Sequence, residues 1–157
     1  MNVASSAYYE SVLAHLPAEI QPVITFAFIT GWRIASEVPL EWRQVDFAAG
    51  EVRLDAGTTK NDDGRVIYMS SELRIILQAL HVEHERLEKA GHLMPNVFFR
   101  EVAKGRGGVK KPRAITALTK AWKSAYRAAG CPGRIPYDLR RTAVRNIVRE
   151  AFRSVWP

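Results

Sequence analysis

Residues 136–146 read PYDLRRTAVRN, and this arginine-dense stretch decides the fold more than any other part of the chain. A helix is predicted to start near Asp138, which places Arg140 in its first turn. There, unpaired backbone N–H groups and the positive end of the helix dipole favour an anion. A guanidinium adds a planar fork of donors that binds phosphate oxygens bidentately. The stretch therefore predicts a phosphate-binding helix start.

Charge supports a polyanionic partner. The chain of 157 residues has a net charge of +7, but residues 1–99 hold 8 Lys and Arg against 13 Asp and Glu, whereas residues 100–157 hold 15 against 3. A basic half favours nucleic acid, because neutralising phosphates releases counterions and drives binding. A solvated basic surface is the alternative that charge by itself leaves open.

Composition excludes several other classes. At 47% hydrophobic residues the chain has the composition of a globular protein, and its length fits one domain. No apolar run reaches membrane-spanning length and the first residues lack a signal-peptide pattern, so we expect a cytoplasmic protein without a membrane partner. Cys131 is the only cysteine, and His81 and His84 have no evident third ligand. We expect no metal and no cofactor, and these histidines are predicted to be solvent-exposed.

Most of the chain is predicted to be helical. Helices are expected over residues 6–16, 18–30, 71–90 and 115–129, with a short one after Ser36 and a last one from Asp138. Gly31 is expected to end the second of these, and Gly91 the long one. The apolar stripe of the long helix comprises Leu73, Ile76, Leu77, Leu80 and Leu87, and the core is expected to hold Trp32, Trp42 and Trp122.

Strand patterns interrupt the helices after residue 43. The runs QVDFAAGEVRL (44–54) and TTKNDDGRVIYMS (58–70) predict a small antiparallel sheet, with Asp63-Gly64 as a turn and Lys60 at or beside a hairpin tip. Residues 96–100 are a further candidate strand. The glycine-rich, basic stretch 101–113 is predicted to be a mobile or phosphate-contacting loop. The fold class is therefore mainly α with a small antiparallel sheet, α+β.

Three basic residues are the best candidates for chemistry. Arg33 follows Gly31, where exposure is expected, and together with Arg140 it can bracket one phosphate and stabilise charge on its oxygens without a metal. Lys60 can donate a proton to a leaving oxygen. Nucleophile-elbow and P-loop patterns are absent from the sequence. Surface ion pairing of these three residues is the alternative.

Four segments together resemble the catalytic domain of the tyrosine recombinases, the phage integrase family. FAFITGWRI (26–34) is similar to the family's T-G-x-R block, and LEWRQVDF (40–47) to the segment that leads into its sheet. TTKNDDGRVIYMS is similar to the catalytic-lysine hairpin. AWKSAYRAAG (121–130) followed by PYDLRRTAVRN is similar to the H-x-x-R block. The segments occur in the family's order, and the resemblance runs from about residue 6 to residue 150.

The resemblance implies the family's fold and its reaction on double-stranded DNA. A tyrosine attacks a backbone phosphate, leaving a 3′-phosphotyrosyl link and a free 5′-hydroxyl, without a cofactor. The resemblance implies that Arg33 and Arg140 are the two catalytic arginines and that Lys60 is the catalytic lysine. Tyr137 stands where the family has histidine. The expected DNA-binding residues are Arg141, Lys104, Arg106, Lys110, Lys111 and Arg113.

The chain also departs from the family pattern. Glu37 stands one position later than the usual acidic residue. After Glu150 the sequence AFRSVWP leaves the pattern, so the downstream histidine motif and the nucleophilic tyrosine are not found. We therefore expect residues 1–157 to form a single, partial recombinase catalytic domain, without the N-terminal DNA-clamping domain and inactive alone.

Three alternatives stay open. A tyrosine from a partner can act in trans, in which case an intact recombinase subunit is a partner. The chain can instead be a non-catalytic interaction protein that modulates an intact recombinase. It can also be a gene remnant that folds poorly because apolar surface is left exposed.

Overall fold

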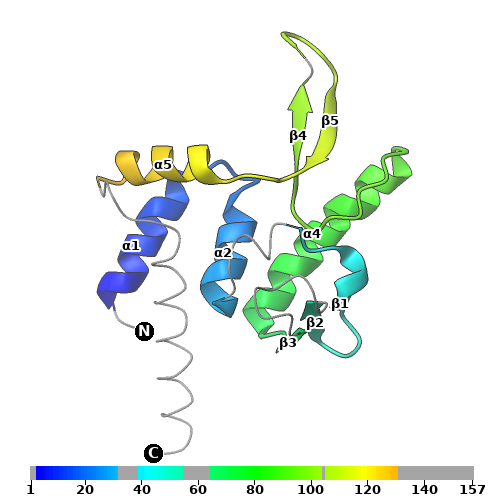
Figure 1. Ribbon diagram of the computed structural model, residues 1–157, viewed down its shortest axis with the longest axis horizontal. Coiled ribbons are helices and arrows are strands. Elements are labelled where there is room, and N and C mark those ends of the chain that lie inside the picture. The colour runs from blue at the N-terminus through cyan, green and yellow to red at the C-terminus, as the bar shows by residue number, and fades with distance from the viewer. Residues whose placement is uncertain (1–2, 32–38, 55–63, 104, 131–157) are drawn as a thin grey trace, which may run out of the picture. The chain divides into compact units, whose positions relative to one another are not determined.

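The computed structural model describes residues 3–31, 39–54, 64–103 and 105–130, with side chains from Tyr9 onward. Helices and two small antiparallel sheets make up this part of the chain, which confirms the α+β class (Figure 1). Contacts divide the chain into two units: residues 1–37 with 117–157, and residues 38–116. Each unit is described separately below.

The first unit contains α1 (Val3–Ala14), α2 (Gln21–Thr30) and α5 (Thr119–Ala128). Tyr9 joins α1 to α2, because its ring stacks on Phe28 at a centroid distance of 4.0 Å and its hydroxyl donates to Thr25 Oγ1 at 2.7 Å. Pro22 lies in the first turn of α2, where a missing N–H costs no helical hydrogen bond. The buried apolar side chains are Tyr9, Val12, Leu16, Ile20, Val23, Ile24, Phe26, Ala27, Leu118, Trp122, Ala125 and Tyr126.

The second unit is built on α4 (Ser71–Lys89) and a three-stranded sheet. The sheet consists of β1 (Val45–Asp46), β2 (Glu51–Leu54) and β3 (Arg65–Tyr68), in that order and antiparallel. Ser70 caps α4, accepting the Leu73 N–H at 3.2 Å. The predicted stripe is confirmed in that Leu73, Leu77 and Leu87 are buried, while Ile76 and Leu80 are half-buried.

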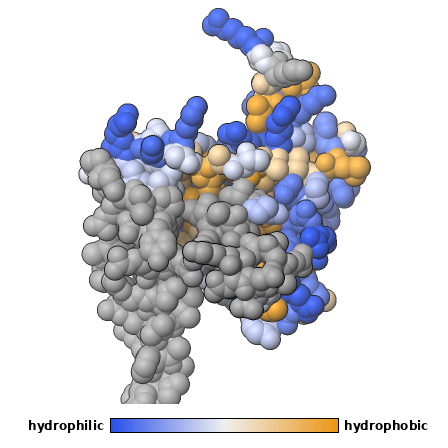
Figure 2. Space-filling view, viewed as in Figure 1, coloured by the Kyte–Doolittle hydropathy of each residue, from blue (hydrophilic) through white to orange (hydrophobic). Residues whose placement is uncertain are grey.

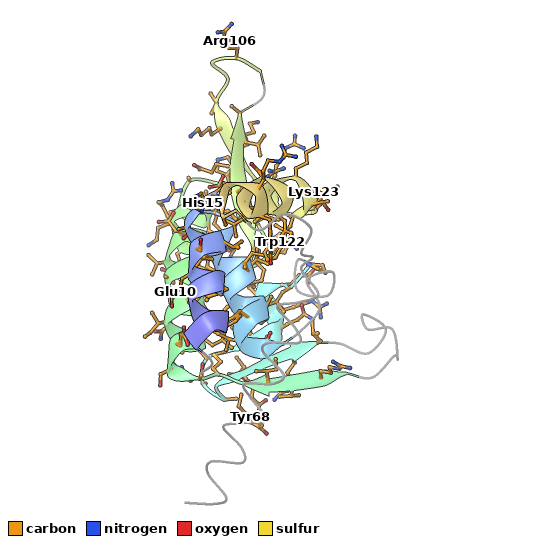
Figure 3. The ribbon with its side chains drawn as sticks, turned by 90° about the vertical axis from the view of Figure 1, so that its left-hand side faces the viewer. Glu10, His15, Tyr68, Arg106, Trp122 and Lys123 are labelled. Carbon is orange, nitrogen blue, oxygen red and sulfur yellow. The ribbon has the colours of Figure 1, made fainter. Side chains whose placement is uncertain are left out.

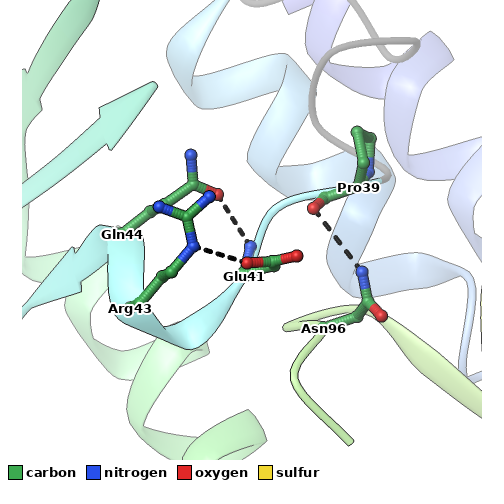
Figure 4. Close-up of polar contacts among 5 residues, drawn as sticks. All are labelled: Pro39, Glu41, Arg43, Gln44 and Asn96. Carbon is green, nitrogen blue, oxygen red and sulfur yellow. Dashed lines mark hydrogen bonds and ion pairs between the residues drawn. The ribbon is translucent and has the colours of Figure 1, made fainter. Parts of the chain in front are cut away.

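A short connector leads from residue 39 into this sheet. It contains the 3₁₀ helix η1 (Trp42–Gln44), whose start is fixed by the Glu41 N–H donating to Gln44 Oε1 at 2.9 Å (Figure 4). Backbone bonds tie the connector to residues 95–97: the Trp42 N–H donates to the Pro95 carbonyl at 2.9 Å, and the Val97 N–H to the Leu40 carbonyl at 2.8 Å. The segment predicted to lead into the sheet therefore does so.

The turn between β1 and β2 is held against α4 by Arg74. Its Nη1 donates to the Phe47 carbonyl at 2.9 Å. Gly50 closes this turn at a φ of 69°, and a Cβ there would meet Arg74 Nη2 at 3.0 Å. The left-handed backbone therefore favours glycine here, while the guanidinium, at the end of a flexible side chain, can shift.

Residues 101–113 are not a loop, and this prediction was wrong. They form most of a hairpin of β4 (Phe99–Ala103) and β5 (Lys110–Ala114), and the candidate strand at 96–100 lies three residues further along the chain as β4. The Ile115 N–H donates to the Phe98 carbonyl, so this residue pair is a hydrogen-bonded one. Hydrogen-bonded and non-hydrogen-bonded pairs alternate along an antiparallel ladder, and Pro112 therefore belongs to a non-hydrogen-bonded pair. Its nitrogen points away from β4, where no N–H is needed. The glycines are confined to the turn, where Gly105 and Gly107 have φ of 83° and 82°.

Candidate nucleic-acid interface

Four of the predicted DNA-binding residues lie on the β4–β5 hairpin. Arg106 is at its tip (Figure 3), while Lys110, Lys111 and Arg113 follow along β5, and all four side chains are exposed. The range Phe99–Ala114 carries six Lys and Arg and one acidic residue, Glu101. Because the two strands are paired over five residue pairs, the charged residues within the strands lie on a defined two-stranded ribbon.

Arg100 belongs to the same hairpin, although the sequence reasoning did not include it among the DNA-binding residues. It lies in β4 directly opposite Arg113, and it is exposed. Arg100 can be assigned to this basic surface only from the register of the strand pair. Predicting residues 101–113 as a loop leaves out that register. Once the two strands are paired, Arg100 joins the basic residues of β5.

A second basic surface was also missed, on α5. Lys120, Lys123 and Arg127 are exposed, and they recur at spacings of three and four residues along the helix. The opposite side of α5 buries Trp122, Ala125 and Tyr126, so the helix is amphipathic. The signal was in the sequence, since TKAWKSAYRA holds three basic residues and no acidic one. Hydrophilic residues project from this helix in the space-filling view (Figure 2).

Three other arginines of the described chain differ from these cations, because each is bonded to a carboxylate. Arg43, Arg53 and Arg86 each bond a nearby glutamate, at 2.6 Å to Glu41, 2.6 Å to Glu51 and 2.8 Å to Glu83. The bond from Glu51 and its charge raise the pKa of Arg53 above its ordinary value, and Glu83 does the same for Arg86. Among the described residues, the hairpin cations and the α5 cations have no ion-pair partner. Their charge is therefore available to an external anion.

The residues predicted to hold the reacting phosphate lie outside the described residues. They are Arg33, Lys60, Tyr137 and Arg140. The expected DNA-binding residues Arg141 and Lys104, the expected short helix after Ser36, the last helix from Asp138, and Trp32 also lie outside. The sequence predictions for them stand as made.

The elements that adjoin three of these residues are described. Gly31 ends α2 as predicted, with a φ of 66° and its N–H donating to the Ala27 carbonyl, two residues before Arg33. β2 and β3 pair from Glu51↔Tyr68 to Leu54↔Arg65, so the segment that contains Lys60 joins two paired strands. The antiparallel sheet predicted for this region is thus confirmed by the β2–β3 pairing, and the predicted position of Lys60 at a hairpin tip lies outside the described residues.

His84 is buried, which contradicts the prediction of an exposed histidine. Its ring stacks on Trp42 at a centroid distance of 5.3 Å, and Nε2 lies 3.4 Å from Glu88 Oε1. His81 meets the same indole edge-on at 4.9 Å and is half-buried. Within the described residues, no group of three or more His, Cys, Asp or Glu is arranged to hold a metal ion. The two histidines pack the connector onto α4.

Of the three tyrosines whose side chains are described, two are buried. Tyr9 and Tyr126 lie in the core of the first unit, and Tyr68 is 75% exposed on β3. Trp122 is in the core as predicted, and Trp42 is half-buried against the two histidines. Only Tyr68 among these three phenols is open to a large substrate.

Comparison with known proteins gives one family. The sequence profile of the Phage integrase family matches residues 4–153. No curated protein matches the chain. Among the described helices, none has the length and hydropathy needed to cross a membrane.

Proposed function

The chain belongs to the phage integrase family of site-specific recombinases, and from this premise we propose that it binds double-stranded DNA through phosphate contacts during DNA integration or recombination. The observation that carries the proposal is the set of exposed cations on the β4–β5 hairpin and on α5, which lack ion-pair partners among the described residues. Such cations displace the counterions of a duplex, and this displacement supplies most of the non-specific affinity.

We assign the reacting phosphate to Arg33, Arg140 and Tyr137, with Lys60 as proton donor to the leaving oxygen. The arginines hold the phosphate oxygens and stabilise the charge that develops on them. Tyr137 can donate a hydrogen bond to the same phosphate, but an ordinary tyrosine, with a pKa of about 10, is a poor general base near neutral pH. Arg141 and Lys104 extend the DNA contacts, and the chemistry requires neither a metal nor a cofactor.

By itself, the chain forms no covalent link to DNA in this proposal. Tyr9 and Tyr126 are buried, and the Tyr9 hydroxyl already donates to Thr25. Tyr68 is exposed but lies in the strand that follows the lysine segment, outside any segment similar to the family's nucleophile. Strand cleavage then needs a tyrosine from an intact recombinase subunit acting in trans. DNA bound in the cytoplasm is the substrate.

A nicked suicide duplex tests this assignment, with wild type compared to Arg140→Ala. We expect no covalent band on a denaturing gel, and a salt-sensitive shift that the variant weakens about tenfold, because a charge-assisted contact to phosphate is lost. Lys89→Ala, which removes an exposed cation from α4, serves as the control and should bind like wild type. A covalent band that Arg140→Ala abolishes would mean that a tyrosine of this chain attacks.

The same experiment separates the alternatives left open by the sequence. Absence of any shift by a chain with a cooperative unfolding transition would favour an interaction protein that acts on an intact recombinase. Absence of that transition would favour a poorly folding remnant. Either result would overturn the DNA-binding proposal for the chain on its own.

A further inference from the structure

The register of the β4–β5 hairpin sorts its charges onto two faces. Residues directly opposite one another in an antiparallel pair lie on the same face, and successive pairs alternate. One face therefore carries the pairs Arg100↔Arg113 and Val102↔Lys111, here named the basic face. The other carries the pairs Phe99↔Ala114, Glu101↔Pro112 and Ala103↔Lys110. The neighbouring residues Lys110 and Lys111 thus lie on opposite faces.

A contact to α4 shows which face is turned toward the rest of the second unit. Glu101 Oε1 lies 3.6 Å from Arg86 Nη2 on α4, so the face of Glu101 is on the side of that helix. Phe99, Pro112 and Ala114, which share this face, are half-buried. By alternation, the basic face is turned away from α4. Arg100, Lys111 and Arg113 are exposed there.

The basic face holds an unfavourable charge arrangement. Directly opposed residues have Cβ atoms about 5 Å apart, and like charges at this distance destabilise the strand pair. Arg100 and Arg113 stand in this relation, and Lys111 is two residues along β5 on the same face. Among the described residues, no carboxylate pairs with any of the three. A bound polyanion would remove the repulsion, whereas the opposite face already contains Glu101.

We propose that the hairpin binds the phosphate backbone of DNA with its basic face, through Arg100, Lys111 and Arg113, and that Lys110 takes no part. This inference rests on the proposed binding of double-stranded DNA and specifies the face that performs it. A two-stranded ribbon fits the major groove of B-form DNA, where one face of the ribbon meets the groove and its flanking phosphates. Phosphate contacts of this kind position the protein without reading sequence.

The test compares two adjacent lysines. Binding of a fluorescein-labelled duplex is measured by anisotropy over a KCl series for wild type, Lys111→Ala and Lys110→Ala. Loss of one phosphate contact lowers the salt slope by about 0.9 and the affinity roughly eightfold at 0.1 M salt. We expect this change for Lys111→Ala, and less than a twofold change with an unaltered slope for Lys110→Ala. Equal losses in the two variants would overturn the face assignment, as would no loss in either.

Arg100→Gln adds a readout that a structural role would not produce. Removing one of two opposed like charges should leave the melting temperature unchanged or raise it, while DNA affinity falls as for Lys111→Ala. A lower melting temperature together with unchanged affinity would contradict the proposal. If wild type shows no salt-sensitive binding at all, the proposed function itself fails. If wild type binds and the basic-face variants bind equally well, only the face assignment fails.

Discussion

Gly31 is a residue whose backbone conformation limits what can replace it. Its φ of 66° is left-handed, and it closes α2 by donating its N–H to Ala27 two residues before Arg33. We predict that Gly31→Ala lowers the free energy of unfolding by about 1 kcal/mol, because an alanine Cβ disfavours this conformation. Gly31→Asn should lose less, since asparagine tolerates the left-handed region. Urea unfolding of both variants measures this; equal stability of Gly31→Ala and wild type would contradict the assigned backbone.

The burial of His84 could not be predicted from its residue type alone. A histidine on a helix is usually exposed, and HVEHE contains enough charge to suggest a solvated face. The structure buries it because Trp42, 42 residues earlier in the chain, supplies an aromatic surface for stacking. Helical periodicity does place His84 on the stripe of Leu73, Leu77 and Leu87, so position along the helix was the better guide than residue type.

At the scale of elements, α5 gives a prediction that is independent of the hairpin. Lys123 is exposed on a helix with three cations and no carboxylate, whereas Lys89 is exposed near the end of α4, which carries several glutamates. We predict that Lys123→Gln reduces the salt slope of DNA binding by about 0.9, because one phosphate contact is lost. Lys89→Gln should leave the slope unchanged.

Anisotropy titrations at four or more KCl concentrations measure both slopes. A reduced slope for Lys89→Gln that equals that of Lys123→Gln would mean that only net charge matters. It would then remove α5 from the interface.

The elements were predicted well wherever a local pattern determines them. The helices α2, α4 and α5 follow from apolar periodicity and from Gly31 and Gly91, and the β2–β3 strands from β-branched residues on both sides of a turn. The β4–β5 hairpin was not recognised, because its glycines and proline indicate a loop. Only the register of the strand pair shows that a proline without an N–H is tolerated at position 112. The basic residues of α5 could have been found from the sequence, because TKAWKSAYRA places them at helical spacings of three and four.

At the scale of the whole molecule, charge is the property that sequence determines most completely. The excess of positive charge after residue 99 comes partly from the β4–β5 hairpin and α5, and partly from residues 131–157 with Arg140 and Arg141. The described cations belong to two separate units of the chain. The hairpin and α5 follow one another within Phe99–Ala128, so the described part of this positive charge comes from one stretch of the sequence.

The most direct measurement of the central claim is the affinity of the wild-type chain for a duplex as a function of salt. The hairpin, α5 and Arg140 together offer on the order of five to seven phosphate contacts, so log K should fall linearly with log[KCl] with a slope of about −5 to −6. Circular dichroism on the same sample establishes that the chain is folded. A folded chain whose binding is absent at 50 mM KCl, or is independent of salt, would contradict the account.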